Sequence, residues 1–239
     1  IILFPFLSFF LFMIAKSSYM TYYAKIFYKK IGVLMPKCPL CQNSSTPFYK
    51  DEFYECICCK GIFRPKEKLL DNEKEKQRYE SHTNNSDDLG YQNFVSPITN
   101  SILNEYKKSN FGLDFGCGKD SPIIKVLRQN EYKIFEYDPY FFDDKKLLEQ
   151  KYDYIACCEV IEHFYNPKKE FELLKFLLKD DSTLYLMTGI YKDNIDFSKW
   201  WYKNDLTHVF IFREKTFEWI KKEFGFKNMC IEKNFIKFS

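Results

Sequence analysis

Four cysteines have the type and spacing to bind one metal ion. Cys38 and Cys41 form one pair, and Cys56 and Cys59 form a second pair after a spacer of fourteen residues. Two residues between thiolates allow both sulfurs to face the same ion, and two such pairs complete a tetrahedral shell of four sulfurs. A closed shell has no position for a substrate, so the pattern predicts a structural zinc ion. Cys58 is an extra thiol that can replace Cys56 or Cys59 in this shell.

A second group of chemically informative residues lies in the stretch FGLDFGCGKDSP at residues 111–122. Gly116 and Gly118 allow a sharp turn and a close approach of the backbone to a ligand. Asp114 stands two residues before the first glycine, and Cys117 lies between the two glycines. Ser121 occupies the position of the last glycine in a dinucleotide-binding turn, so the pattern argues against a dinucleotide site.

An acidic residue ends the next apolar stretch, KIFEYD at residues 133–138. A carboxylate at the end of a strand can accept the hydrogens of both hydroxyls of a ribose. Asp138 is the better-placed acid for this role, and Glu136 is the alternative.

Polar residues also follow a third apolar stretch, YDYIACCEVIEHF at residues 152–164. It reads as a buried strand that ends at Cys158, with Glu159 directly after it. His163 closes the stretch, and His208 follows in the later sequence DLTHV. Imidazole suits proton removal near neutral pH, so both histidines are candidate general bases. A structural role, such as bracing the following helix, is the alternative for each.

Together the three stretches resemble the motifs of class I S-adenosylmethionine-dependent methyltransferases, in the same order. The turn at residues 114–118 resembles the first motif of that family, although Asp120 stands where its third glycine is usual. Residues 152–164 resemble its fourth-strand motif. The resemblance implies S-adenosylmethionine as cofactor, with the turn along its methionine part and the strand-end acid on its ribose. The implied cofactor-binding residues are Asp114, Gly116, Cys117, Gly118, Asp138, Cys158 and Glu159.

Positioning these residues requires strands and helices that alternate along the chain. We expect strands at residues 111–115, 133–138, 152–158 and 183–190, helices from Pro122 and over residues 167–178, and a terminal hairpin from Phe226. This order predicts an α/β fold with a Rossmann-like, mostly parallel sheet, helices on both faces, and a ligand at the carboxyl ends of the strands. Only twenty residues separate Asp138 from Glu159, so the usual third strand and its helix must be compressed.

The chain divides into four segments by composition. We expect a hydrophobic extension at 1–34, a zinc ribbon at 35–66, a helical linker or lid at 67–108, and the methyltransferase domain at 109–239. The whole chain is similar to bacterial members of the family that carry a zinc ribbon before this domain. The apolar run at the start is shorter than the roughly 18 residues that span a membrane and has no basic segment before it. We interpret residues 1–34 as a translation or fragment artefact, with a membrane anchor as the alternative.

Aromatic residues flank the expected core on both sides. Tyr79, His82 and Tyr91 precede it, and we expect them to fold over the cofactor as a lid, because methyl transfer requires that water be kept out. An ordinary linker is the alternative. After the fifth strand come Trp200, Trp201 and Tyr202, which can stack on a planar acceptor or simply pack on the sheet.

The charge of the chain is nearly balanced, with 36 lysines and arginines against 33 acidic residues. Such a balance does not demand a polyanionic partner, so a small or lipid-like metabolite is favoured as the methyl acceptor. RNA or protein is the rival class, because some ribosomal RNA methyltransferases also carry an amino-terminal zinc module. A non-catalytic scaffold with a degenerate core is a further alternative. The paired cysteines indicate a reducing, cytoplasmic compartment.

Overall fold

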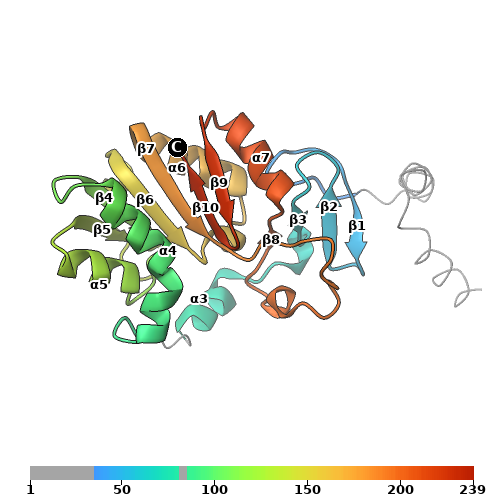
Figure 1. The fold of residues 1–239 in the computed structure, drawn as a ribbon. Coiled ribbons are helices and arrows are strands. Elements are labelled where there is room, and N and C mark those ends of the chain that lie inside the picture. The colour runs from blue at the N-terminus through green and yellow to red at the C-terminus, as the bar shows by residue number, and fades with distance from the viewer. Residues whose placement is uncertain (1–34, 81–84) are drawn as a thin grey trace, which may run out of the picture.

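The computed structural model describes residues 35–80 and 85–239 (Figure 1). The expected amino-terminal extension and His82 lie outside these residues. Within the described part of the chain, no helix is both long and apolar enough to cross a bilayer.

A six-stranded sheet forms the centre of the molecule, in the order β5-β4-β6-β7-β10-β9. The strands β5, β4, β6 and β7 are parallel, and the last two pair antiparallel. The expected Rossmann-like, mostly parallel sheet with a terminal hairpin is therefore confirmed. The strands are β4 (Phe111–Phe115), β5 (Lys133–Tyr137), β6 (Tyr152–Cys158), β7 (Leu178–Met187), β9 (Met229–Glu232) and β10 (Phe235–Phe238).

Helices cover both faces of this sheet (Figure 1). On one face, α4 (Leu89–Glu105) and α5 (Pro122–Gln129) pack on Tyr154 and Ala156 of β6. On the other, α6 (Pro167–Leu177) and α7 (Glu214–Glu223) share a core with Ile155 and Cys157. Successive residues of β6 thus point to opposite faces, as the period of a strand requires. Both faces of the sheet are buried, which explains why β6 is apolar from Tyr154 to Cys158.

The compressed segment between β5 and β6 forms no strand. Asp138 and Phe142 form an isolated bridge, and a short 3-10 helix, η3 (Lys145–Leu148), follows. The strand β5 is therefore the edge of the sheet on this side. This is the compression that the short spacing predicted.

The cysteine-rich segment forms a second sheet of four strands, ordered β1-β2-β3-β8. Its hairpin comprises β1 (Ser45–Tyr49) and β2 (Phe53–Cys56), and β3 (Ile62–Phe63) pairs with β2. The fourth strand, β8 (Phe210–Ile211), comes from the loop between β7 and α7. The ribbon thus includes a strand from the far end of the chain, and its buried cysteines join the same core as α6 and α7. A 3-10 turn, η2 (Lys66–Lys68), and the helix α3 (Asn72–Glu80) lead back toward the large sheet.

Candidate active site

The glycine turn lies between β4 and α5, at the carboxyl edge of the sheet. Gly116 and Gly118 have φ values of +78° and +64°, a region that favours glycine. The amides of Gly116 and Cys117 both donate to the carbonyl of Tyr137, at 2.8 and 3.2 Å, so the turn is tied to the end of β5. A Cβ atom at Gly116 would lie 2.6 Å from the side chain of Val160. Close packing as well as the turn itself therefore requires glycine here.

Asp114 braces this turn from inside the protein. Its side chain is buried, and its Oδ2 accepts a hydrogen bond of 2.5 Å from the hydroxyl of Ser121. The same hydroxyl caps α5 by accepting from the amide of Ile124, and Pro122 fills the first helical position. Burial raises the pKa of Asp114 to about 7. Asp114 thus holds the helix start against β4.

Asp138 lies directly after β5 and is 7% exposed. Its Oδ2 accepts from the amide of Gly118 at 3.0 Å, and its Oδ1 accepts from the amides of Tyr140 and Phe141 at 2.8 and 3.2 Å. Three amide hydrogens leave one of the roughly four lone-pair sites of a carboxylate for a ligand. The alternative acid, Glu136, forms an ion pair of 3.2 Å with Arg128 and does not line the cavity described below.

Asp120, which replaces the usual third glycine, has a role of its own. Its Oδ2 accepts a hydrogen bond of 2.8 Å from the amide of Ser86, just before α4. This bond holds the segment before α4 against the glycine turn and lowers the pKa of Asp120. Asp120, the residue that departs from the motif, therefore connects the glycine turn to the segment before α4.

One cavity of about 820 Å³ lies at the carboxyl ends of the strands. Its size is typical of sites for small ligands. Residues from the turn, from the ends of β5 and β6, and from α3 and α4 all line it. All of the cofactor residues predicted from the sequence lie on its wall, namely Asp114, Gly116, Cys117, Gly118, Asp138, Cys158 and Glu159, and so do both candidate bases, His163 and His208.

Buried polar residues meet at the other end of this cavity. Glu162, in the 3-10 turn η4 (Ile161–His163), is fully buried. Its Oε1 accepts from the hydroxyl of Tyr202 at 2.5 Å, and its Oε2 accepts from the hydroxyl of Thr188 at 3.0 Å. The Tyr202 hydroxyl also lies 3.4 Å from Oε2 of Glu159. Burial and the neighbouring Glu162 raise the pKa of Glu159 to about 9. Glu159 has a φ of +52°, and such strain in a non-glycine residue is often found at functional sites.

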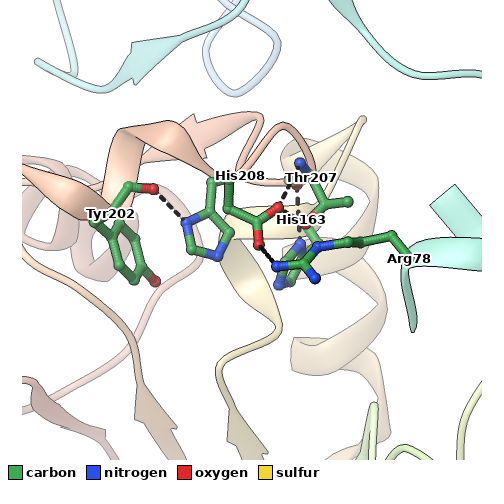
Figure 2. Close-up of polar contacts among 6 residues, drawn as sticks. Arg78, His163, Tyr202, Thr207 and His208 are labelled. Atoms are coloured by element: carbon green, nitrogen blue, oxygen red, sulfur yellow. Dashed lines mark hydrogen bonds and ion pairs between the residues drawn. The ribbon is translucent and has the colours of Figure 1, made fainter. Parts of the chain in front are cut away.

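The two histidines belong to this polar cluster, and their ring centroids are 4.9 Å apart. Nδ1 of His163 lies 2.9 Å from the carbonyl oxygen of Thr207, and Nδ1 of His208 lies 2.7 Å from that of Tyr202. Figure 2 shows both contacts. A carbonyl only accepts, so Nδ1 of each ring carries a hydrogen. Burial lowers the pKa of His208, which favours its neutral form.

The helix α3 covers the cavity between its two ends. The ring of Tyr79 packs on Tyr140 and on His163, at centroid distances of 5.5 and 5.4 Å. Glu75 accepts hydrogen bonds from the hydroxyls of Tyr79 and Tyr140, at 3.1 and 2.9 Å. Arg78, labelled in Figure 2, forms an ion pair of 2.8 Å with Asp205. Tyr79 and Tyr91, two of the three residues of the predicted lid, thus line the cavity.

A second hollow of about 460 Å³ adjoins the first and shares Glu159 and Trp201 with it. Trp201 is 70% exposed at the shared rim, in the 3-10 turn η5 (Trp201–Asn204). Trp200 stacks on Tyr202 at a centroid distance of 5.0 Å. Of the three predicted aromatic residues, Tyr202 therefore packs inside the polar cluster, and Trp201 is the one that lines both hollows.

The four predicted metal-binding cysteines come together in the ribbon. Their sulfur atoms all lie within 4.8 Å of one another. The distances are 3.6 Å from Cys38 to Cys59 and 3.2 Å from Cys41 to Cys56. Sulfurs bound to one zinc ion at about 2.3 Å lie roughly 3.8 Å apart in a tetrahedron, which is close to these values. Cys58 is exposed and outside the group, and all nine cysteines are free thiols.

Arg64 connects the ribbon to the polar end of the cavity. Its side chain is 6% exposed, and it donates to the carbonyls of Lys203 and His208 at 2.8 and 3.3 Å. Its own amide donates to the carbonyl of Val209 at 2.9 Å. The pairing of β3 with β8 continues this contact. The ribbon therefore supports the loop that carries His208.

Several residues of the site were not predicted from the sequence. Glu162 and Thr188 meet only in the folded chain, and the hydrogen bond of Tyr202 to Glu162 was not expected from its aromatic ring. Glu75 and Arg78 lie in a charged stretch that resembles an ordinary solvated helix. The one sequence feature that could have indicated a role for Glu162 was its position directly before the candidate base His163.

Comparison with known proteins identifies one family. The sequence model described as "Methyltransferase domain" matches residues 90–231, more than half of the chain. This match includes α4, which packs on α5 and on the sheet. A search of curated proteins finds no match.

Several solved structures have a similar fold. Human N-acetylserotonin methyltransferase in complex with S-adenosylmethionine is 11% identical, with a TM-score of 0.48 over 70% of this chain and 56% of that one. An O-methyltransferase family protein from Burkholderia thailandensis is also 11% identical, with a TM-score of 0.48 over 69% and 61% of the two chains. Phosphoethanolamine N-methyltransferase 2 from Haemonchus contortus is 13% identical, with a TM-score of 0.48 over 72% and 47%. The chain thus spans between 47% and 61% of the length of these proteins. Identities this low carry no information about its acceptor.

Proposed function

The chain belongs to the methyltransferase domain family, and we propose that it transfers the methyl group of S-adenosylmethionine to a small molecule. One observation carries the proposal. A single cavity has the glycine turn and Asp138 at one end and a buried cluster of carboxylates and imidazoles at the other. The first end suits an adenosyl cofactor, and the second suits a polar acceptor.

The cofactor end supplies its contacts mainly through fixed backbone groups. The turn offers close approach at Gly116 and Gly118, and Asp138 keeps an acceptor site for a ribose hydroxyl. The sulfonium of the cofactor already activates its methyl group, so the protein mainly has to align the two reactants and exclude water. The cover formed by α3 supports the second task.

A small acceptor fits the site better than a polynucleotide does. The cavity lies beneath α3, and Tyr79 of that helix packs on His163 at its polar end. Arg64, the only arginine of the ribbon at residues 35–66, is buried and bonded to backbone carbonyls, so it is not available to an RNA surface. We therefore favour a small organic acceptor over RNA or protein.

We also propose that the ribbon binds one structural zinc ion through Cys38, Cys41, Cys56 and Cys59. The four thiols point at one another, and the segment is too small to fold securely on its own apolar core. The ion would hold β3 in place, and through β3 the loop of β8.

Labelled methyl transfer tests the proposed acceptor class. The full chain is incubated with S-adenosylmethionine labelled in its methyl group and with separated small-molecule, RNA and protein fractions of a cell extract. We expect label in the small-molecule fraction and none after Asp138→Ala. Label found only in RNA or only in protein would overturn the proposal of a small acceptor.

A further inference from the structure

Three residues at the polar end of the cavity carry side-chain atoms that suit a metal ion. One ligand atom each from Glu162, His163 and His208 lies within 4.8 Å of the others. Ligands that share an ion at about 2.1 Å lie roughly 3 to 4 Å apart, so small side-chain rotations bring these atoms to one ion. His163 and His208 also line the cavity in which the acceptor would bind.

Both imidazoles are held as metal-bound imidazoles usually are. A histidine that binds a metal through one nitrogen almost always donates its other N–H to a carbonyl or carboxylate. His163 donates from Nδ1 to Thr207 at 2.9 Å, and His208 donates from Nδ1 to Tyr202 at 2.7 Å. These bonds fix the rings, and Nε2 is the nitrogen of each ring through which it would bind an ion (Figure 2).

The carboxylate of Glu162 is held in the same way. The hydroxyls of Tyr202 and Thr188 donate to its two oxygens, at 2.5 and 3.0 Å, and each oxygen keeps a further lone pair. Hydrogen bonds of this kind orient the carboxylates that bind metals. Glu159 adds a second carboxylate 3.4 Å from the Tyr202 hydroxyl.

The cluster contains a buried acid, Glu162, and a half-buried one, Glu159. Within residues 35–80 and 85–239, no lysine or arginine forms an ion pair with Glu159 or Glu162. Burial of carboxylates is costly unless a cation or a shared proton offsets their charge. A divalent cation placed between the carboxylates and the two imidazoles would supply that charge.

We propose that Glu162, His163 and His208 bind a divalent cation, with Glu159 at its edge, and that the cation coordinates a hydroxyl oxygen of the acceptor. This inference rests on the proposed function and narrows the acceptor to an alcohol or phenol. Two imidazoles and one or two carboxylates form a mixed ligand set that suits Mn²⁺, Fe²⁺ or Zn²⁺. Three protein ligands leave open positions for the acceptor oxygen.

Coordination makes the hydroxyl a better nucleophile, because a bound cation lowers the pKa of an oxygen that it holds. The O–H bond breaks and its proton passes to bulk water. The oxygen then forms a bond to the methyl carbon, and the bond from carbon to sulfur breaks with its electron pair on sulfur. The products are a methyl ether and S-adenosylhomocysteine, and nothing is oxidised or reduced. The histidines act as ligands in this step, so neither has to remove the proton.

Titration of the full chain with Mn²⁺, followed by electron paramagnetic resonance, tests this site. The protein first receives one molar equivalent of zinc, which the four thiolates bind in preference to a site of imidazoles and carboxylates, so that the cysteines do not compete for the added Mn²⁺. We expect about one bound Mn²⁺ per chain, lost in His163→Gln and in His208→Gln. Thr188→Val removes the hydrogen bonds of this hydroxyl to Glu162 and Tyr202 and should weaken binding roughly 10- to 100-fold. Glu170→Gln, a change to another cavity acid outside the cluster, should leave binding unchanged.

Calorimetry with S-adenosylmethionine on the same samples separates this inference from the proposed function, and circular dichroism checks that each variant folds. Two results would overturn the metal site and leave the methyltransferase proposal intact. One is that the protein binds the cofactor but no Mn²⁺. The other is that wild type and both histidine variants bind Mn²⁺ equally. Mn²⁺ binding that depends on the histidines, in a protein that binds no cofactor, would support the site and refute the proposed function.

Discussion

The two ends of the cavity are built in different ways. The cofactor end consists of backbone groups and acids that follow strand ends, and its parts lie within short stretches of the chain, such as residues 111–122. The polar end brings together Glu162, Thr188 and His208 from three separate segments, and the ribbon supports it through Arg64. Local sequence fixes the first end, whereas long-range packing fixes the second. Changes in the ribbon should therefore damage the polar end and leave the cofactor end intact.

The largest expected effect comes from removal of the zinc ion. Cys59→Ser removes one of four thiolates, so the ribbon should lose its ion and β3 should no longer hold β8. We expect loss of zinc by metal analysis and a fall in turnover of more than about 100-fold, if the loop of His208 depends on the ribbon as the contacts indicate. Cys58→Ser, at an exposed thiol, is the matched control. Zinc content equal in the two variants would refute the four-cysteine site.

The second prediction concerns Asp114 at the cofactor end, and how its contribution to the free energy of unfolding changes with pH. The pKa of the buried Asp114 is about 7 when folded, against an ordinary value of 3.8. At this group the folded protein therefore binds more protons than the unfolded chain between these values, so the contribution of Asp114 to stability is complete below pH 4 and is lost as the pH rises through 7. The loss amounts to about 4 kcal/mol at most.

Asp114→Asn should remove this contribution, because an amide does not ionise and still accepts a hydrogen bond from Ser121. Denaturant unfolding from pH 4 to pH 8 measures it as the difference between the wild-type and variant curves. Parallel curves for the two proteins would show that Asp114 does not titrate in this range.

A smaller effect is expected from Arg64→Met. This change keeps the packed stem and removes two hydrogen bonds, to the carbonyls of Lys203 and His208. A hydrogen bond to a charged group contributes about 1.5 to 3 kcal/mol, so turnover should fall roughly 10- to 100-fold as the loop shifts. Affinity for S-adenosylmethionine should stay unchanged. Lys66→Met, at an exposed neighbour, serves as the control. A loss of cofactor affinity in Arg64→Met would contradict the separation of the two ends.

The smallest effect is a change in hydrogen exchange without any mutation. If α3 and the segment up to Tyr91 close over the cofactor, the amides of α3 should exchange more slowly when S-adenosylhomocysteine is bound. Exchange in α7, which does not line the cavity, provides the reference. Equal exchange in α3 with and without ligand would identify this segment as an ordinary linker.

The difference between the two ends also explains what the sequence could predict. The glycine turn, Asp138 and the strand β6 are local patterns, and the structure places their residues together on the cavity wall as expected. The pairing of β3 with β8 joins residues about 150 positions apart, and no local pattern carries that information. The same holds for Tyr202, which was expected to stack on a planar acceptor or to pack on the sheet, and whose hydroxyl contacts Glu159 and Glu162.

Calorimetric titration with S-adenosylmethionine tests the central claim most directly, because it measures one end of the cavity while either end is changed. Asp138→Ala should weaken binding by about 2 to 4 kcal/mol, as it removes a ribose contact and loosens the turn at Gly118. His208→Gln, at the other end, should leave the affinity within a factor of about three of wild type. The account would be contradicted if the wild-type protein bound no S-adenosylmethionine. It would also be contradicted if the affinity fell with His208→Gln and not with Asp138→Ala.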